Sequence, residues 1–182
     1  MKRFAFICFL LAFLITLTAC GARQEPLETW PITYSTSMAC YVRDYPDIAS
    51  MQVEGHIIFH GKAVALVEEG QYGVILELEP IASTGDGSGN ILLRQTKDPG
   101  IVLKKGEEVV LILRPAYDEG VWEGFNGDCG IFRLDEGTGN VTGARLDSLL
   151  ESAPQSYSAK GGKDLTLAQV YDLLVELDNS GE

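Results

Sequence analysis

The sequence predicts a mainly β protein: a small β-barrel with a short helix before the first strand and a C-terminal amphipathic helix. Short apolar segments recur between residues 56 and 142, and glycine-rich turns separate them. A leucine-rich segment after residue 165 instead follows the 3.6-residue period of a helix. Short strands at this spacing are typical of a barrel or a sandwich, and a long, bent first strand favours the barrel.

The chain begins like a secretory signal. Lys2 and Arg3 precede an apolar run from residue 4 to residue 17, and small residues follow it. A transmembrane helix needs about 20 apolar residues, so this run is too short for a span. The tetrapeptide 17–20, Leu-Thr-Ala-Cys, resembles the lipobox of bacterial lipoproteins. The resemblance implies that residues 1–19 are a signal peptide and that Cys20 carries the lipid of an extracytoplasmic cell-membrane anchor.

Removal of the signal leaves enough chain for one domain with a real core. The formal charge then changes from −12 to −14, because the signal carries two basic residues and no acidic residue. Such an acidic surface repels phosphate backbones, so nucleic acid is excluded as the expected partner. Lipid on Cys20 is the expected contact with the membrane.

Two cysteines remain besides the lipidated one. Cys8 leaves with the signal, so Cys40 and Cys129 are left in a compartment that permits disulfides. We predict that they form a disulfide bond. Two free, buried thiols are the alternative.

The elements follow in order. Residues 20–39 are polar and irregular, which indicates a lipidated tether. Trp30 in this tether is expected either at the headgroup boundary or packed on the domain, and we favour packing. Residues 44–51 predict one or two helical turns. Residues 56–67 predict the first strand, with a bulge or bend at Gly61. Six further strands are predicted at residues 72–78, 91–96, 108–114, 121–126, 130–134 and 140–142.

The C-terminal part holds the clearest helix of the chain. Thr166 and Gln169 have the spacing of a capping box at its start. One helical face, which must be buried, carries Leu167, Val170, Leu173, Leu174 and Leu177. The predicted organisation is therefore a barrel over residues 40–143 and a linker with this helix over residues 144–182.

No residue pattern predicts a catalytic centre, a metal site or a cofactor. His56 and His60 are four residues apart, which on a strand separates them by roughly 13 Å, too far to share one metal ion. Acidic residues from Asp118 to Glu136 lie on successive loops. If their hairpins converge, they predict an alternative function, an extracytoplasmic metal-dependent hydrolase.

The order of elements resembles a known family. A cysteine at position 40, a short helix, the strand 56–64, a glycine-turned strand at 105–113 and Cys129 follow one another. This order is similar to the netrin and tissue-inhibitor-like variant of the OB barrel, and to uncharacterised exported lipoproteins of Gram-positive bacteria. The resemblance implies an OB-like barrel from Cys40 to about Gly143. In the metalloproteinase inhibitors of this family, an N-terminal cysteine supplies the amine that binds the metal. Cys40 is internal, so the inhibitory activity does not carry over.

The predicted function is a non-enzymatic binding or adaptor module. The signal, the barrel pattern and the lack of a catalytic constellation favour it over an enzyme. An envelope protein, a peptide or a glycan is the expected partner. Tyr72, Trp122 and Phe125 are the predicted binding residues, because an exposed aromatic patch marks an interaction surface.

Overall fold

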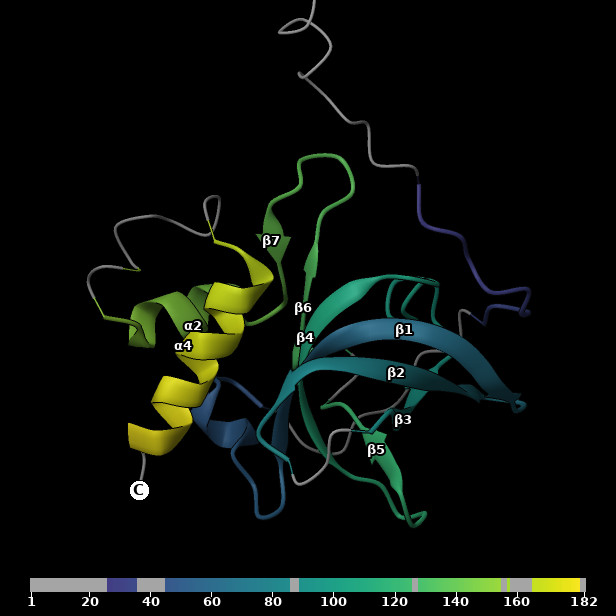
Figure 1. The fold of residues 1–182 in the computed structure, drawn as a ribbon, viewed down its shortest axis with the longest axis horizontal. Helices are drawn as coiled ribbons and strands as arrows, with labels where there is room; N and C mark the ends of the chain where they lie inside the picture. The colour runs from purple at the N-terminus through teal and green to yellow at the C-terminus, as the bar shows by residue number, and fades with distance from the viewer. Residues whose placement is uncertain are drawn as a thin grey trace, which may run out of the picture.

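Strands dominate the fold, and five of them close into a barrel (Figure 1). The computed structural model describes residues 26–35, 45–85, 89–125, 128–154, 157 and 165–180. The strands in these residues form one sheet: β1 (Ile57–Glu69), β2 (Gly73–Ser83), β3 (Ile91–Thr96), β4 (Glu108–Pro115), β5 (Val121–Glu123), β6 (Ile131–Leu134) and β7 (Val141–Thr142).

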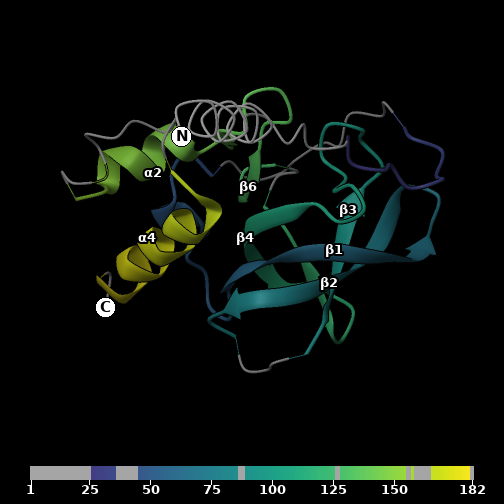
Figure 2. The same ribbon diagram turned by 45° about the horizontal axis from the view of Figure 1, so that its top comes forward.

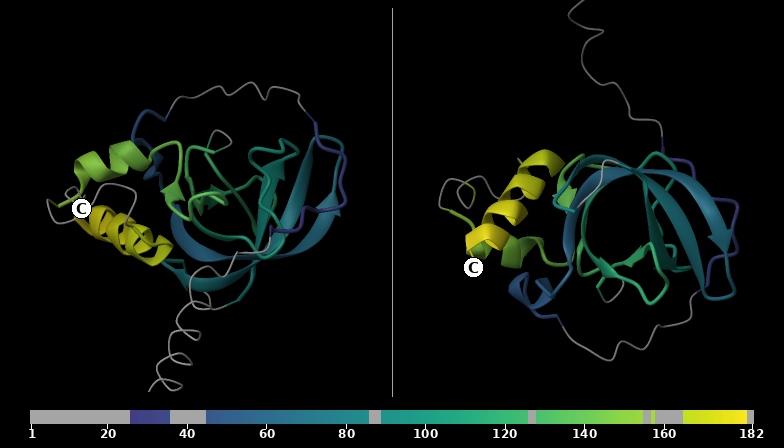
Figure 3. Two further views of the ribbon diagram at one scale, coloured as in Figure 1. Left: turned by 90° about the horizontal axis from the view of Figure 1, so that it is seen from above. Right: turned by 60° about the horizontal axis from the view of Figure 1, so that its bottom comes forward.

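The strand order in the barrel is β1-β2-β3-β5-β4, and β4 pairs back to β1 to close the ring (Figure 3). Neighbouring strands are antiparallel, except that β3 and β5 run parallel. β6 and β7 extend the sheet from β4. This is the order of an OB barrel, so the predicted OB-like fold is confirmed and the sandwich is excluded.

Bulges let β1 bend around the barrel. The β1–β2 pairing shifts register at three places, at Gly61, after Ala63 and after Leu66. A Cβ atom added at Gly61 would lie 2.3 Å from the carbonyl oxygen of Glu79 and 2.5 Å from the Phe59 ring. The predicted bend at Gly61 is confirmed, and only glycine allows so close an approach.

Two apolar cores lie on opposite sides of β1 and β4. Val109, Leu111 and Leu113 of β4 point into the barrel, whereas Val110 and Ile112 face the helices. A strand that is buried on both faces forms a continuous apolar run instead of an alternating one. The lack of alternation in residues 108–114 therefore has a structural cause.

The helices α2 (Leu146–Ser152) and α4 (Leu167–Ser180) lie together on one side of the barrel, and α4 packs on β1, β4 and β6 (Figure 2). The Thr166 N–H donates to Gln169 Oε1 at 3.0 Å, and the Gln169 N–H donates to Thr166 Oγ1 at 3.2 Å. The predicted capping box is thus present. Its helix buries four residues of the predicted face, Leu167, Val170, Leu173 and Leu174, and the fifth, Leu177, is half-buried.

Thr166→Ala is expected to lower the free energy of unfolding by about 1 kcal/mol, because an N–H group of the first turn loses its acceptor. Thr166→Ser keeps the hydroxyl and should stay close to the wild type. Urea denaturation measures both variants. Equal stability of the alanine variant and the wild type would show that the capping box does not stabilise α4.

The predicted helix before β1 is shorter than expected. It is a single 3₁₀ turn, η1 (Ala49–Met51), within the described part of residues 44–51. The Ser50 N–H donates to Asp47 Oδ1 at 2.8 Å, which fixes the start of the turn. Met51 is fully buried in the core on the helix side.

Trp30 packs on the domain, which confirms the favoured environment. Its side chain is 7% exposed and belongs to the barrel core. The indole Nε1–H donates to the Leu103 carbonyl oxygen at 2.7 Å. Because the indole is buried and its single N–H donor is hydrogen-bonded, Trp30 holds its segment of the chain on the barrel.

Backbone contacts hold the rest of residues 26–35, which we call the docked segment. Lys105 N–H donates to the Glu28 carbonyl oxygen, and Ser35 N–H donates to the Lys97 carbonyl oxygen, both at 2.9 Å. The segment runs along the barrel end that carries the β1–β2 and β3–β4 loops (Figure 1). Residues 20–39 were predicted as a tether throughout, but residues 26–35 are part of the domain.

Glu69 joins this end of the barrel to the docked segment. Lys97 Nζ lies 2.5 Å from Glu69 Oε1, and the Thr33 N–H donates to the same oxygen at 3.3 Å. The hydrogen bond from Lys97, followed by that from Thr33, holds the pKa of Glu69 below its ordinary value.

Acid is expected to loosen the docked segment. Because the pKa of Glu69 is lower in the folded state, its contacts stabilise docking fully at pH values above the ordinary, unfolded pKa. That stabilisation is lost as the pH falls through the lower folded pKa. In a Trp122→Phe background, Trp30 emission should shift to the red in this acid range. The same shift with the same midpoint in Glu69→Gln would contradict the assignment.

Some predictions fall outside the described residues. The signal peptide (residues 1–19), the lipidation site Cys20 and Cys40 all lie there. No helix of the described residues is long and apolar enough to cross a membrane.

The Cys40–Cys129 disulfide stays a prediction. Cys129 is 8% exposed, and its N–H donates to the Phe125 carbonyl oxygen at 3.1 Å. The Phe125 ring contacts Tyr45, with ring centroids 4.9 Å apart. Cys40 precedes Tyr45 by five residues, a reach of about 17 Å. Peptide mapping without reductant should yield the linked pair, and alkylation of both thiols in unreduced protein would contradict it.

Candidate functional site

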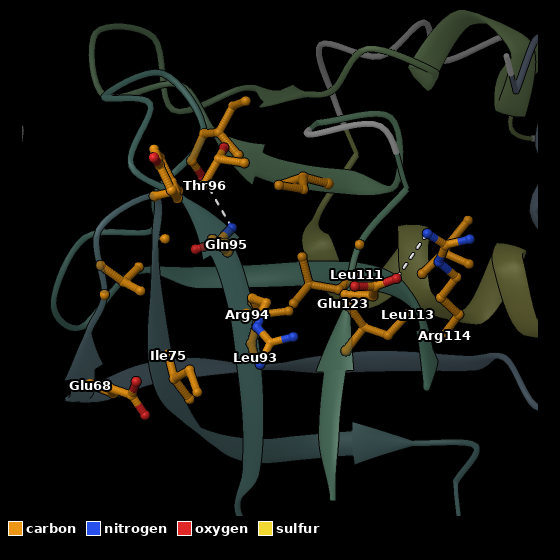
Figure 4. Close-up of a pocket in the computed structure, with 18 residues that line it drawn as sticks. Glu68, Ile75, Leu93, Arg94, Gln95, Thr96, Leu111, Leu113, Arg114 and Glu123 are labelled. Carbon is orange, nitrogen blue, oxygen red and sulfur yellow. Dashed lines mark hydrogen bonds and ion pairs between the residues drawn. The ribbon is translucent and has the colours of Figure 1, made fainter. Parts of the chain in front are cut away.

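A groove of about 430 Å³ opens in the described surface where β5 ends (Figure 4). β3 continues to Thr96, but β5 pairs with it only from Leu92 to Arg94. The chain leaves the barrel wall after Glu123. Beyond that point β6 pairs with β4 from Val109 to Leu111, but no described strand joins β3 to β6, and the groove opens between them.

The floor of the groove is apolar. It is made by interior side chains of β2, β3, β4 and β6, each at most 4% exposed: Val74, Leu93, Leu111, Leu113 and Ile131. The half-buried Ile75 and Ile101 continue this apolar surface to the rim. A concave apolar surface with a few polar groups at its edge is the usual form of a ligand site.

Charged side chains cross the groove in one row. The register pairs Glu68 with Ile75, Ile75 with Arg94, Arg94 with Glu123, and Glu123 with Arg114. These five residues all line the groove, and successive members lie on neighbouring strands. The row therefore presents acidic, apolar, basic, acidic and basic groups across the sheet.

Ion pairs hold both arginines of the row in place. Arg94 pairs with Asp118 of the β4–β5 loop. Arg114 Nη2 lies 2.8 Å from Glu123 Oε1, a pair that Figure 4 shows. Arg114 Nη1 also donates to the Tyr45 hydroxyl at 3.3 Å. A guanidinium group fixed by several partners presents its remaining donors in a defined direction.

Two buried polar atoms at the groove lack a hydrogen bond. They are Thr96 Oγ1 and Arg114 Nε, and in the described residues no other buried side-chain nitrogen or oxygen shares this state. Both residues line the groove. An unsatisfied buried polar group costs about 1–3 kcal/mol, so a polar group placed beside these atoms would be favourable.

The three predicted aromatic residues do not form one exposed patch. Tyr72 is 74% exposed and lies at the edge of the groove. Trp122 is half-buried against the barrel core. Phe125 is fully buried, with Arg114 stacked over its ring at 5.4 Å from the centroid. Packing therefore removes Phe125 from the predicted aromatic patch, while Tyr72 stays exposed and Trp122 stays partly exposed.

The histidines are paired with carboxylates at the contact with α4. His56 Nε2 lies 3.0 Å from Asp178 Oδ1, and His56 Nδ1 lies 2.8 Å from the Val53 carbonyl oxygen. The buried His60 places Nε2 at 2.9 Å from Glu108 Oε1. His56 therefore links the residue before β1 to α4, and His60 links β1 to β4.

The acidic residues of the alternative hypothesis do not converge. Asp118, Glu123 and Glu136 pair separately with Arg94, Arg114 and Lys104. Asp135 accepts hydrogen bonds within its own turn, first from the Thr138 hydroxyl, and these lower the pKa of its carboxyl group. In the described part of the chain, no three His, Cys, Asp or Glu side chains form a group that could hold a metal ion.

Reasoning from the sequence missed the groove. It lies between segments far apart in the chain, and its rim depends on where β5 ends. The short apolar segment 121–126 was predicted as a six-residue strand, but β5 covers only Val121–Glu123. Gly124 and the turn after it were the signal for an early end.

Comparison with known proteins gives no relative. No protein-family model, no curated protein and no solved structure matches the sequence.

Proposed function

We propose that the protein is an extracytoplasmic binding or adaptor module, anchored to the cell membrane by lipid on Cys20, that holds its partner in the groove beside β5. The groove is the observation that carries the proposal. Its apolar floor, its rim of fixed charges and the exposed Tyr72 suit a folded or extended segment of an envelope protein, a peptide or a glycan.

The OB-like fold also favours the groove as the binding surface. OB barrels bind oligosaccharides and oligonucleotides over strands β2 and β3, between the β1–β2 and β4–β5 loops. The groove takes residues from both strands and from the β1–β2 loop, and Asp118 brings the β4–β5 loop to its edge. The charge of −12 over the whole chain disfavours a nucleic acid there, which leaves a protein, peptide or glycan.

Crosslinking on intact cells tests this function. The tagged protein is crosslinked, and trapped partners are identified by mass spectrometry in parallel with a Cys20→Ala form. The expected result is a discrete partner that is lost when the lipid address is removed. An equal set of partners for both forms, or no partner at good crosslinking yield, would contradict an anchored adaptor.

Two matched variants on β2 locate the binding face. Ile75 lines the groove, whereas Ile81 is 53% exposed and is not among the groove residues. Ile75→Asp should abolish recovery of the partner, because a charge would enter the apolar surface. Ile81→Asp should leave recovery unchanged. Equal loss in both variants would place binding elsewhere.

A further inference from the structure

The docked segment shortens the free part of the tether. Cys20 precedes Pro26, the first described residue, by six positions, so this stretch reaches at most about 20 Å. If the whole stretch from Cys20 to Tyr45 were free, it would reach about 85 Å. Docking therefore shortens the maximum distance between the barrel and a lipid on Cys20.

The contacts of the docked segment identify the end of the barrel that is held. Glu28 pairs with Lys105 through the backbone and through an ion pair of 3.1 Å, both at the β3–β4 loop. Trp30 is bound at Leu103 of the same loop. The chain that leads to Cys20 thus leaves the domain beside the β3–β4 loop.

We propose that this barrel end, formed by the docked segment and the β3–β4 loop, is the surface that faces the lipid bilayer, at a distance set by residues 20–26. The inference rests on the proposed lipid anchor. A bilayer is the partner because the attachment point lies within about 20 Å of this end. The mature chain has a charge of −14, so anionic lipids do not attract it; the lipid anchor and its short tether hold the barrel end near the bilayer.

This orientation places one edge of the groove near the membrane. Tyr72 at the groove edge belongs to the β1–β2 loop, which lies at the same barrel end as the docked segment. The β4–β5 loop, which carries the fully exposed Tyr117, lies at the opposite end. The Tyr72 edge of the groove would therefore face the bilayer, and the edge at Asp118 would point away from it.

Two insertions of equal length distinguish a docked segment from a free tether. About forty Gly/Ser residues are inserted either between Glu25 and Pro26 or between Ser35 and Thr36 of the lipidated full-length protein. Only the first insertion lies on the path between the lipid and the docked segment. A flexible insertion of this length adds roughly 25 Å to the root-mean-square reach.

The readout is energy transfer from a dye at Gly100, in the β3–β4 loop, to headgroup-labelled lipid in phosphatidylcholine vesicles. We expect the insertion before Pro26 to lower transfer efficiency at least two-fold and the insertion after Ser35 to leave it unchanged. An equal decrease for both insertions would overturn the inference. Trp30→Ala combined with the second insertion should restore the decrease, and unchanged transfer in that variant would also count against docking.

Flotation separates this inference from the proposed anchor. The protein and both insertion variants are floated with the vesicles before the transfer measurement. If the protein does not float, both the proposed lipid anchor and the proposed orientation are contradicted. If the protein floats but both insertions lower the energy-transfer efficiency equally, the lipid anchor is supported and the proposed orientation is contradicted.

Discussion

Gly61→Ala is expected to lower the free energy of unfolding by about 3 kcal/mol, the upper end of the range for overpacking. The added methyl group would lie 2.3 Å from the Glu79 carbonyl oxygen and 2.5 Å from the Phe59 ring. Neither neighbour can yield cheaply, because one is backbone of β2 and the other is a fully buried ring. Strands β1 and β2 must separate at the bend.

Gly89→Ala is the matched control for this substitution. Among the described residues, and apart from its own chain neighbours, a Cβ at Gly89 would meet no atom within 4 Å. Urea denaturation of both variants should therefore show a large shift for position 61 and nearly none for position 89. Two equal, small shifts would mean that the β1–β2 ribbon is not held as closely at Gly61 as the structure describes.

Leu173→Ala is expected to cost about 3 kcal/mol, within the range for truncating a fully buried leucine. Leu173 is 0% exposed in the core between α4 and the outer faces of β1, β4 and β6. Because that core includes Val110 and Ile112 of β4, loss of α4 packing should destabilise the barrel as well. Barrel and helix should unfold in one transition.

Glu176→Ala on the exposed side of the same helix serves as the control and should stay within about 0.5 kcal/mol of the wild type. Far-ultraviolet circular dichroism reports on the whole fold, and the fluorescence of Trp30 and Trp122, which both pack in or against the barrel core, reports on the barrel. Two separate transitions in the Leu173→Ala variant, one per probe, would show that residues 144–182 are an independent appendage.

Local patterns predicted most of the elements. β3 covers residues 91–96 as expected, because turn residues bracket it on both sides. Thr166 and Gln169 located the start of α4, since a capping box is a purely local signal. The bend at Gly61 followed from one glycine inside a long apolar run.

The candidate site depended on tertiary structure and escaped prediction. Aromatic residues were expected at the surface, but Phe125 is buried because the chain after β5 folds back over Tyr45 and Arg114. The alternation of Glu68, Ile75, Arg94 and Glu123 arises only from the cross-strand register. No spacing within one segment encodes that register.

We propose the groove beside β5 as the binding face of the anchored protein. The most direct test places a photo-crosslinking amino acid at Ile75, on the groove rim, and in a second strain at Glu176, on the exposed side of α4. Intact cells that express the full-length protein are then irradiated. We expect a discrete adduct from position 75 and none from position 176. Adducts of equal yield at both positions, or none at position 75, would contradict the claim.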